Sequence, residues 1–133
     1  MKVQEILTEG LQYNKATTIL EKFIRFAAKE LGLKQLPKFE LQEGNSISVK
    51  HSSFGGYGNG HINVKLSNRN IMDVCRTIAH ELVHFRQDLN NELTPDSGKD
   101  GSPHENEANA QAAVIMRKWG KMYPNLFKQP AVE

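Results

Sequence analysis

The segment His80-Glu81-Leu82-Val83-His84 decides how the fold of this chain is interpreted. It lies in a stretch with helical periodicity, so His80 and His84 are expected one turn apart on the same side of a helix. Two imidazole nitrogens in that position can share one metal ion. Glu81 adds a carboxylate that can exchange protons beside the ion. The pentapeptide therefore predicts a metal centre carried by a helix.

The helix around this segment is expected to begin near residues 67–70 and to run to about residue 90. An apolar stripe follows it at about 100° per residue. The stripe consists of Ile71, Val74, Cys75, Ile78, Leu82, Phe85 and Leu89. The histidines lie almost opposite this stripe, together with Asp73, Thr77 and Gln87. We expect one face of the helix to be buried and the other to present the histidines; exposed histidines without a metal are the simpler alternative.

A third ligand is expected from the next predicted helix, because tetrahedral zinc with two histidines needs one more protein ligand. A catalytic site leaves the fourth position for water. Three residues near the start of that helix compete for the role: His104, Glu105 and Glu107. The helix is expected to follow an N-cap at Ser102, with Pro103 in its first position.

A helical projection favours Glu105. The predicted buried arc consists of Ala108, Ala112, Ala113, Ile115, Met116 and Trp119. Glu105 and Asn109 point into the middle of this arc, whereas Glu107 lies on the far side. A carboxylate facing a core is costly unless it has a partner, and a metal supplies one. Glu105 is the expected ligand, Asn109 is expected to hold a ligand side chain, and Glu107 is the fallback. The alternative is a capping box, in which Glu105 only satisfies a backbone N–H at the helix start.

The rest of the chain predicts an α+β domain spanning residues 11–133. Helical periodicity over residues 14–31 ends at Gly32. Alternation with a period of two then predicts short strands around residues 39–41, 47–49 and 62–66. Residues 55–60 are rich in glycine and are interpreted as a mobile loop before the last strand. The expected order is helix, three strands, helix, helix.

Composition excludes several classes of protein. The chain has 133 residues, 17 basic and 15 acidic, with a formal charge of +2. This net positive charge is too low to indicate a nucleic-acid-binding protein. The basic run Arg117, Lys118, Lys121 and Lys128 is interpreted as a solvated helix end. No apolar stretch approaches the roughly 18 residues needed to cross a bilayer. Cys75 is the single cysteine and has no partner, which favours a reducing compartment such as the cytoplasm.

The two motifs together resemble a known family. His80-Glu81-Leu82-Val83-His84 followed by Glu105-Asn106-Glu107-Ala108-Asn109 resembles the small single-domain gluzincin metallopeptidases, including the ImmA/IrrE-like group. In that family a glutamate four residues before an Asn or Asp is the third ligand, here Glu105. The resemblance implies a zincin-like fold with an N-terminal helix, a small sheet, an active-site helix and a ligand helix. After Asn109 the chain departs from the Phe-Ala and Leu-Leu-Met-Pro continuation that is usual in the ImmA/IrrE-like group.

The expected activity is that of a zinc metalloendopeptidase acting on a protein or peptide. Zn²⁺ activates a water molecule, and Glu81 serves as general base. Tyr57, His61 and His104 are candidate oxyanion donors, none of them assigned. The strand at residues 61–66 is expected to pair with an extended substrate if it borders the cleft. The alternative is a non-catalytic, zinc-stabilised peptide-binding or phage-head interaction protein, which would not need Glu81.

Residues 1–10 resemble the capsid-targeting leaders of internal head proteins of T-even-type phages. Those leaders begin Met-Lys, carry Gln-Glu before a hydrophobic pair and are cleaved after Leu/Ile-x-Glu, here Leu7-Thr8-Glu9. The resemblance implies association with a phage capsid and delivery into the host cytoplasm. The same tripeptide pattern recurs at residues 19–21 and 41–43, and a frayed amphipathic turn is the alternative.

Overall fold

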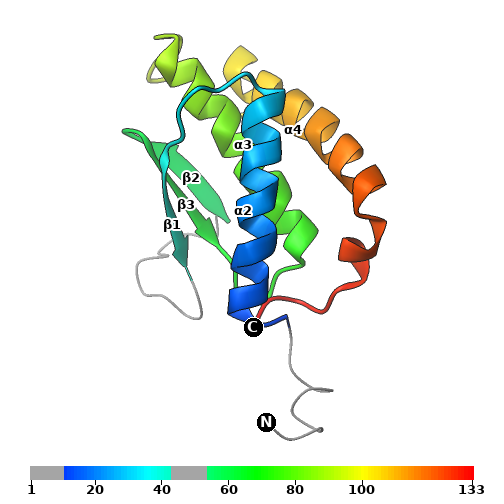
Figure 1. Ribbon diagram of the computed structural model, residues 1–133. Helices are drawn as coiled ribbons and strands as arrows, with labels where there is room; N and C mark the ends of the chain where they lie inside the picture. The colour runs from blue at the N-terminus through cyan, green and yellow to red at the C-terminus, as the bar shows by residue number, and fades with distance from the viewer. Residues whose placement is uncertain (1–10, 43–53) are drawn as a thin grey trace, which may run out of the picture.

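The computed structural model describes residues 11–42 and 54–133 and has a mixed α+β architecture (Figure 1). Its elements are α2 (Tyr13–Glu30), β1 (Lys38–Gln42), β2 (Gly55–Gly58), β3 (His61–Lys65), α3 (Ile71–Leu89), α4 (Pro103–Met122) and the 3-10 helix η1 (Pro124–Lys128). The three long helices confirm the three that were expected. The strand expected at residues 47–49 and the leader at residues 1–10 lie outside the described residues. None of the described helices has both the length and the apolar character needed to cross a membrane.

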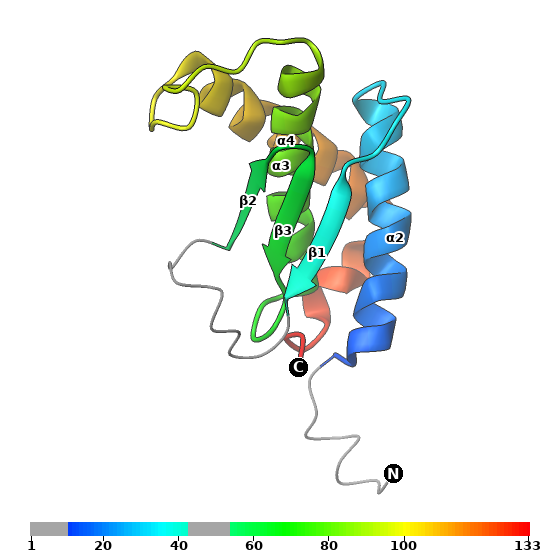
Figure 2. The same ribbon diagram turned by 90° about the vertical axis from the view of Figure 1, so that its left-hand side faces the viewer.

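The three strands form one sheet with β3 in the centre, in the order β1-β3-β2 (Figure 2). β1 runs parallel to β3 and β2 runs antiparallel to it, so both Phe39 and Tyr57 pair with Ile62. The alternation expected for β3 is confirmed, since Ile62 and Val64 are fully buried. The expectation that this strand offers a free edge was wrong, because both of its edges already carry ladder hydrogen bonds.

The glycine-rich stretch forms strand β2 and the turn that follows it, so the prediction of a mobile loop was wrong. Asn59 and Gly60 have positive φ angles of 50° and 77°, as a two-residue type I′ hairpin turn requires. A Cβ atom on Gly55 would lie 2.6 Å from Cγ2 of Thr77 and 2.9 Å from the carbonyl oxygen of Asn63. Glycine is therefore needed at position 55 because β2 packs closely against α3.

Helix α3 lies between the sheet and α4 (Figures 1 and 2). It contacts α2, α4, β2, β3 and η1. The predicted apolar stripe is buried except for Leu89, which is 41% exposed. Residues beyond the stripe are buried as well, namely Met72, Ala79, Glu81, Val83, His84 and Gln87. The expectation of one buried face was wrong because α4 covers the side of α3 that the sheet leaves free.

The two ends of the described chain meet beside the start of α3. The backbone N–H of Leu11 donates to the carbonyl oxygen of Ala131 at 2.7 Å. Val132, which is 1% exposed, donates its N–H to the carbonyl oxygen of Arg69 at 2.8 Å. These bonds hold the C-terminal segment against the segment that leads into α3.

Candidate metal centre

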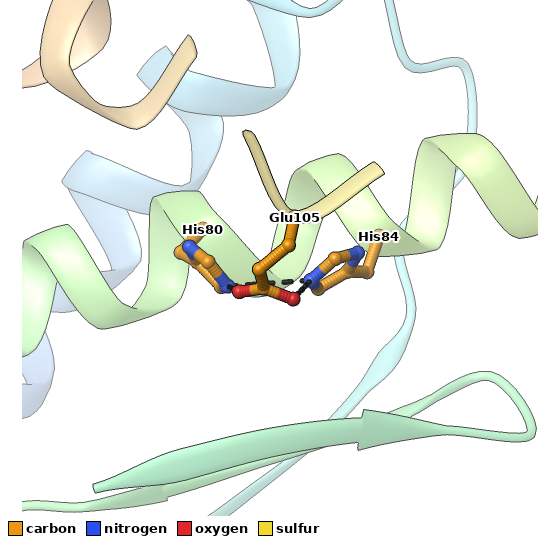
Figure 3. A group of neighbouring side chains, drawn as sticks. All are labelled: His80, His84 and Glu105. Atoms are coloured by element: carbon orange, nitrogen blue, oxygen red, sulfur yellow. Dashed lines mark hydrogen bonds and ion pairs between the residues drawn. The ribbon is translucent and has the colours of Figure 1, made fainter. Parts of the chain in front are cut away.

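Helices α3 and α4 bring the three predicted ligands to one point (Figure 3). Nε2 of His84 lies 3.2 Å from Nε2 of His80 and 3.1 Å from Oε2 of Glu105. Nε2 of His80 lies 2.6 Å from Oε1 of Glu105. Within residues 11–42 and 54–133, no other group of three His, Cys, Asp or Glu side chains brings its ligand atoms this close together.

Both helices begin with a side-chain cap that orients the site. Oδ1 of Asn70 accepts a hydrogen bond from the N–H of Met72 at 2.8 Å. Oγ of Ser102 accepts one from the N–H of Glu105 at 3.1 Å, which confirms the expected N-cap. The N–H of Ser102 donates to the carbonyl oxygen of Lys99 rather than to a carboxylate. The capping-box alternative was therefore wrong for Glu105, whose carboxylate faces the two histidines.

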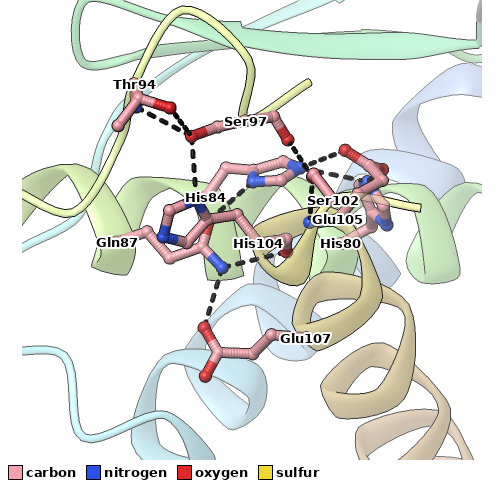
Figure 4. A network of polar contacts seen from close by, with 9 residues as sticks. All are labelled: His80, His84, Gln87, Thr94, Ser97, Ser102, His104, Glu105 and Glu107. Atoms are coloured by element: carbon pink, nitrogen blue, oxygen red, sulfur yellow. Dashed lines mark hydrogen bonds and ion pairs between the residues drawn. The ribbon is translucent and has the colours of Figure 1, made fainter. Parts of the chain in front are cut away.

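Gln87 determines which nitrogen of His84 carries the proton (Figure 4). Its Nε2 donates to the carbonyl oxygen of His104 at 3.0 Å and to Oε1 of Glu107 at 2.7 Å. Because both of these oxygens are acceptors, the oxygen of the Gln87 amide faces Nδ1 of His84, 2.8 Å away. A neutral His84 is then protonated on Nδ1 and presents a lone pair on Nε2.

The donor set fits a divalent zinc ion. The lone pair on Nε2 of His84 faces a carboxylate oxygen and a second imidazole nitrogen, so a cation between them would relieve their repulsion. Tetrahedral zinc with ligand bonds of 2.0–2.1 Å holds its ligand atoms about 3.3 Å apart. The separations of 3.1 and 3.2 Å at His84 are close to that value. The 2.6 Å separation between His80 and Glu105 is shorter and corresponds to a direct hydrogen bond.

Glu81 lies next to this cluster and is 8% exposed. No hydrogen bond or ion pair joins its side-chain carboxyl to another described residue. Burial raises the pKa of Glu81 to about 7, with His84 acting to lower it and Glu105 to raise it. Burial also lowers the pKa of His80, against the opposing effect of Glu105. A carboxyl with a pKa near neutrality can both accept and release a proton.

The structure places the remaining predicted residues of α4 as follows. The fallback ligand Glu107 lies outside the cluster, where it accepts the hydrogen bond from Gln87 and lies 4.0 Å from Nη2 of Arg86. Asn109 lies near His80, where it acts to raise the pKa of the imidazole, but it is exposed rather than buried. Ala113 is also exposed and does not belong to the buried arc.

The three candidate oxyanion donors contact residues other than His80, His84 and Glu105. The hydroxyl of Tyr57 donates to the carboxylate of Asp88, and burial together with this bond raises the pKa of Tyr57 to about 12. Nδ1 of His104 lies 2.8 Å from Oγ of Ser97 (Figure 4). His61 is exposed at the start of β3. No hydrogen bond joins any of these three described residues to His80, His84 or Glu105.

Sequence reasoning missed Gln87, which it placed on the exposed side of the helix with the histidines. The available signal is its position three residues after His84, a spacing that makes side chains neighbours on a helix. Its partners Glu107 and His104 come from α4, about 20 residues later in the chain, so the full network is a tertiary feature.

Comparisons of this chain with protein-family models, curated proteins and solved structures found no match. The resemblance to gluzincins therefore stays a prediction that depends on the quoted motifs. The geometry of His80, His84 and Glu105 is the feature of this chain that points to a function.

Proposed function

We propose that this protein is a zinc-dependent peptidase with a zincin-like site, in which His80, His84 and Glu105 hold the metal. The observation that carries the proposal is the convergence of three ligand atoms from two helices, with His84 Nε2 left as an acceptor by Gln87. Zinc bound there would lower the pKa of a water ligand to about 7 and polarise the scissile carbonyl.

Glu81 is the proposed general base. It would accept a proton from the attacking water and deliver it to the leaving amine, so that the peptide bond is hydrolysed without a covalent intermediate. Its position next to His80, its burial and the absence of a competing partner among the described residues support this role. Cys75 is fully buried and the pKa of its thiol is raised above the usual range by burial, which makes it a poor nucleophile.

Strand β2, rather than β3, is the proposed site for an extended substrate. In the described part of the chain, the edge of β2 that faces away from β3 has no paired strand. The β2–β3 hairpin passes beside the His80–His84 segment of α3 (Figure 3), and β2 contacts that helix. A peptide that adds to this edge would form main-chain hydrogen bonds while its reacting carbonyl approaches the metal.

Replacement of Glu81 by glutamine tests the proposal. We expect Glu81→Gln to lower the rate of hydrolysis of a peptide library by about 10²–10⁴-fold, because the general base is lost. Zinc content, measured by atomic emission, should stay near one ion per chain, because Glu81 is not in the ligand cluster. Glu21→Gln, an exposed change on α2, is the matched control and should leave both quantities unchanged.

Three results would contradict parts of this proposal. Equal activity in Glu81→Gln and the unsubstituted protein would remove the mechanism. A purified, refolded protein that fails to bind zinc would remove the metal centre. Zinc and peptide binding without any cleavage would favour the non-catalytic peptide-binding protein instead.

A further inference from the structure

A hollow of about 370 Å³ lies between α3 and α4 and is lined by three cationic side chains, Arg76, Arg117 and Lys121. All three residues are exposed, and no acidic residue lines the hollow. Its remaining lining is largely apolar and includes Met116 and the 53% exposed Phe127. A concentration of like charge around an apolar floor costs free energy unless an anionic ligand offsets the repulsion.

The basic residues of α4 are therefore not all equivalent solvated side chains at a helix end. Lys118 belongs to the same run but pairs with Glu30 of α2 at 2.5 Å, on another side of α4. Arg117 and Lys121 instead share the hollow with Arg76, which comes from α3. No described residue forms an ion pair with these three cations.

The hollow lies along the same two helices as the candidate metal centre, on the sides that carry His80 and Glu105. On α3, Arg76 precedes His80 by four residues, so the two lie on the same side, about 6 Å apart along the axis. On α4, Asn109 follows Glu105 by four residues, so the two lie on the same side of that helix. Ala113 follows by four more and already lines the hollow. Glu105, Asn109 and Ala113 therefore lie in one row along α4, with Glu105 at the candidate metal centre and Ala113 at the hollow.

The distances along the helices set where a bound peptide would meet these cations. Arg76 lies about 6 Å from His80 along α3, and Arg117 lies about 18 Å from Glu105 along α4. An extended peptide advances by about 3.3 Å per residue. A chain with its reacting bond at the metal would reach the hollow about two to five residues away on one side.

We infer that this hollow is a subsite for acidic side chains of the peptide substrate, an inference that rests on the proposed peptidase function for the position of the cut. Glu and Asp carboxylates on one side of the scissile bond would pair with Arg76, Arg117 and Lys121, while their methylene groups pack on Met116 and Phe127. The preferred substrates are proteins with an acidic segment beside the cleaved bond.

Fluorescence anisotropy with zinc-loaded Glu81→Gln protein separates binding from cleavage. The probes are two labelled, otherwise degenerate peptide pools that carry either Glu or Gln at fixed positions flanking the centre. We expect the Glu pool to bind about 3- to 10-fold more tightly at low ionic strength, and the difference to shrink as salt is added. In an Arg76→Glu/Arg117→Glu background the preference should disappear, and a pool with Lys at the same positions should bind better than the Glu pool.

Arg25→Glu/Lys29→Glu on the exposed face of α2 is the matched control, since it changes the net charge equally and should leave the preference intact. Equal affinity for the Glu and Gln pools, or a preference that survives in the Arg76→Glu/Arg117→Glu protein, would overturn the inference. Tighter binding of a single-stranded DNA oligonucleotide than of the Glu pool would assign the hollow to nucleic acid instead.

The two proposals can fail separately. If the unsubstituted protein cuts no peptide but the Glu preference depends on Arg76 and Arg117, the acidic subsite stands and the peptidase function fails. If peptides are cut without regard to acidic residues and the pools bind equally, the function stands and the subsite fails.

Discussion

Gln87 connects the candidate metal centre to the polar residues of α4. Its side chain is 1% exposed, and both ends of its amide are used. The oxygen accepts from Nδ1 of His84, and the nitrogen donates to Glu107 and to the backbone of His104. One buried residue thus sets the tautomer of His84 and links it to α4, the helix that carries Glu105.

Replacement of Gln87 by leucine should weaken zinc binding about 10- to 100-fold, because His84 loses the acceptor that holds Nε2 unprotonated and oriented. Competition with a chromophoric chelator measures the dissociation constant, after circular dichroism has shown that the variant is folded. Gln35→Leu, at an exposed position, is the control. A folded Gln87→Leu protein that binds zinc as tightly as the unsubstituted one would disprove this role for Gln87.

At the scale of elements, Arg69 joins the sheet to α3, the helix that carries His80 and His84. It is 6% exposed, donates to the carbonyl oxygen of Lys65 at 2.8 Å and pairs with Asp73 at 2.9 Å. Its guanidinium also donates to Oγ1 of Thr77 at 2.6 Å and stacks over the ring of Phe54 at 4.4 Å. These contacts hold the start of β2 and the end of β3 against α3, where the substrate edge is proposed.

The close packing of β2 on α3 predicts a strong effect of a single methyl group. Gly55→Ala should lower the free energy of unfolding by about 1–3 kcal/mol, because the added Cβ overlaps Thr77 and the carbonyl oxygen of Asn63. Thr77→Ser removes the methyl group 2.6 Å from that Cβ and should restore part of the loss. Urea denaturation measures each value. Gly58→Ala, with open space around its Cβ, is the control, and equal destabilisation by the two alanine substitutions would contradict the packing argument.

Across the whole molecule, the candidate metal centre joins two helices that the chain connects only through a long loop. His84 and Glu105 are 21 residues apart in sequence, yet their side chains meet. A metal that binds the folded chain but not the unfolded one stabilises the fold by mass action. Metal loading should therefore affect global stability as well as activity.

Removal of zinc should lower the melting temperature by on the order of 5–15 °C when the ion is first present at about 100 times its dissociation constant. Differential scanning calorimetry with and without a chelator measures the shift. The His80→Ala/His84→Ala protein should show no shift, because it lacks both imidazole ligands. Identical melting temperatures of the zinc-loaded and chelator-treated protein would argue against a metal centre.

Short-range sequence patterns were sufficient to predict the three long helices and one of their caps. The helix cap at Ser102 and the placement of His80 and His84 on one side of α3 follow from rules that act within a few residues of a helix. The geometry of a helix alone determines which side chains lie on the same side of it, and this does not depend on the neighbouring elements. The Asn59-Gly60 turn was equally local, and the hairpin was missed because its glycines were interpreted as flexibility.

The sequence by itself determined the helices and which residues are available as ligands. Only the tertiary structure decided that β3 is central, that Gln87 reaches Glu107, and that Arg76 joins Arg117 around one hollow. Each of these depends on contacts between residues far apart in the chain. Such contacts arise when the sheet and α4 bury opposite sides of α3, and no short-range periodicity encodes them.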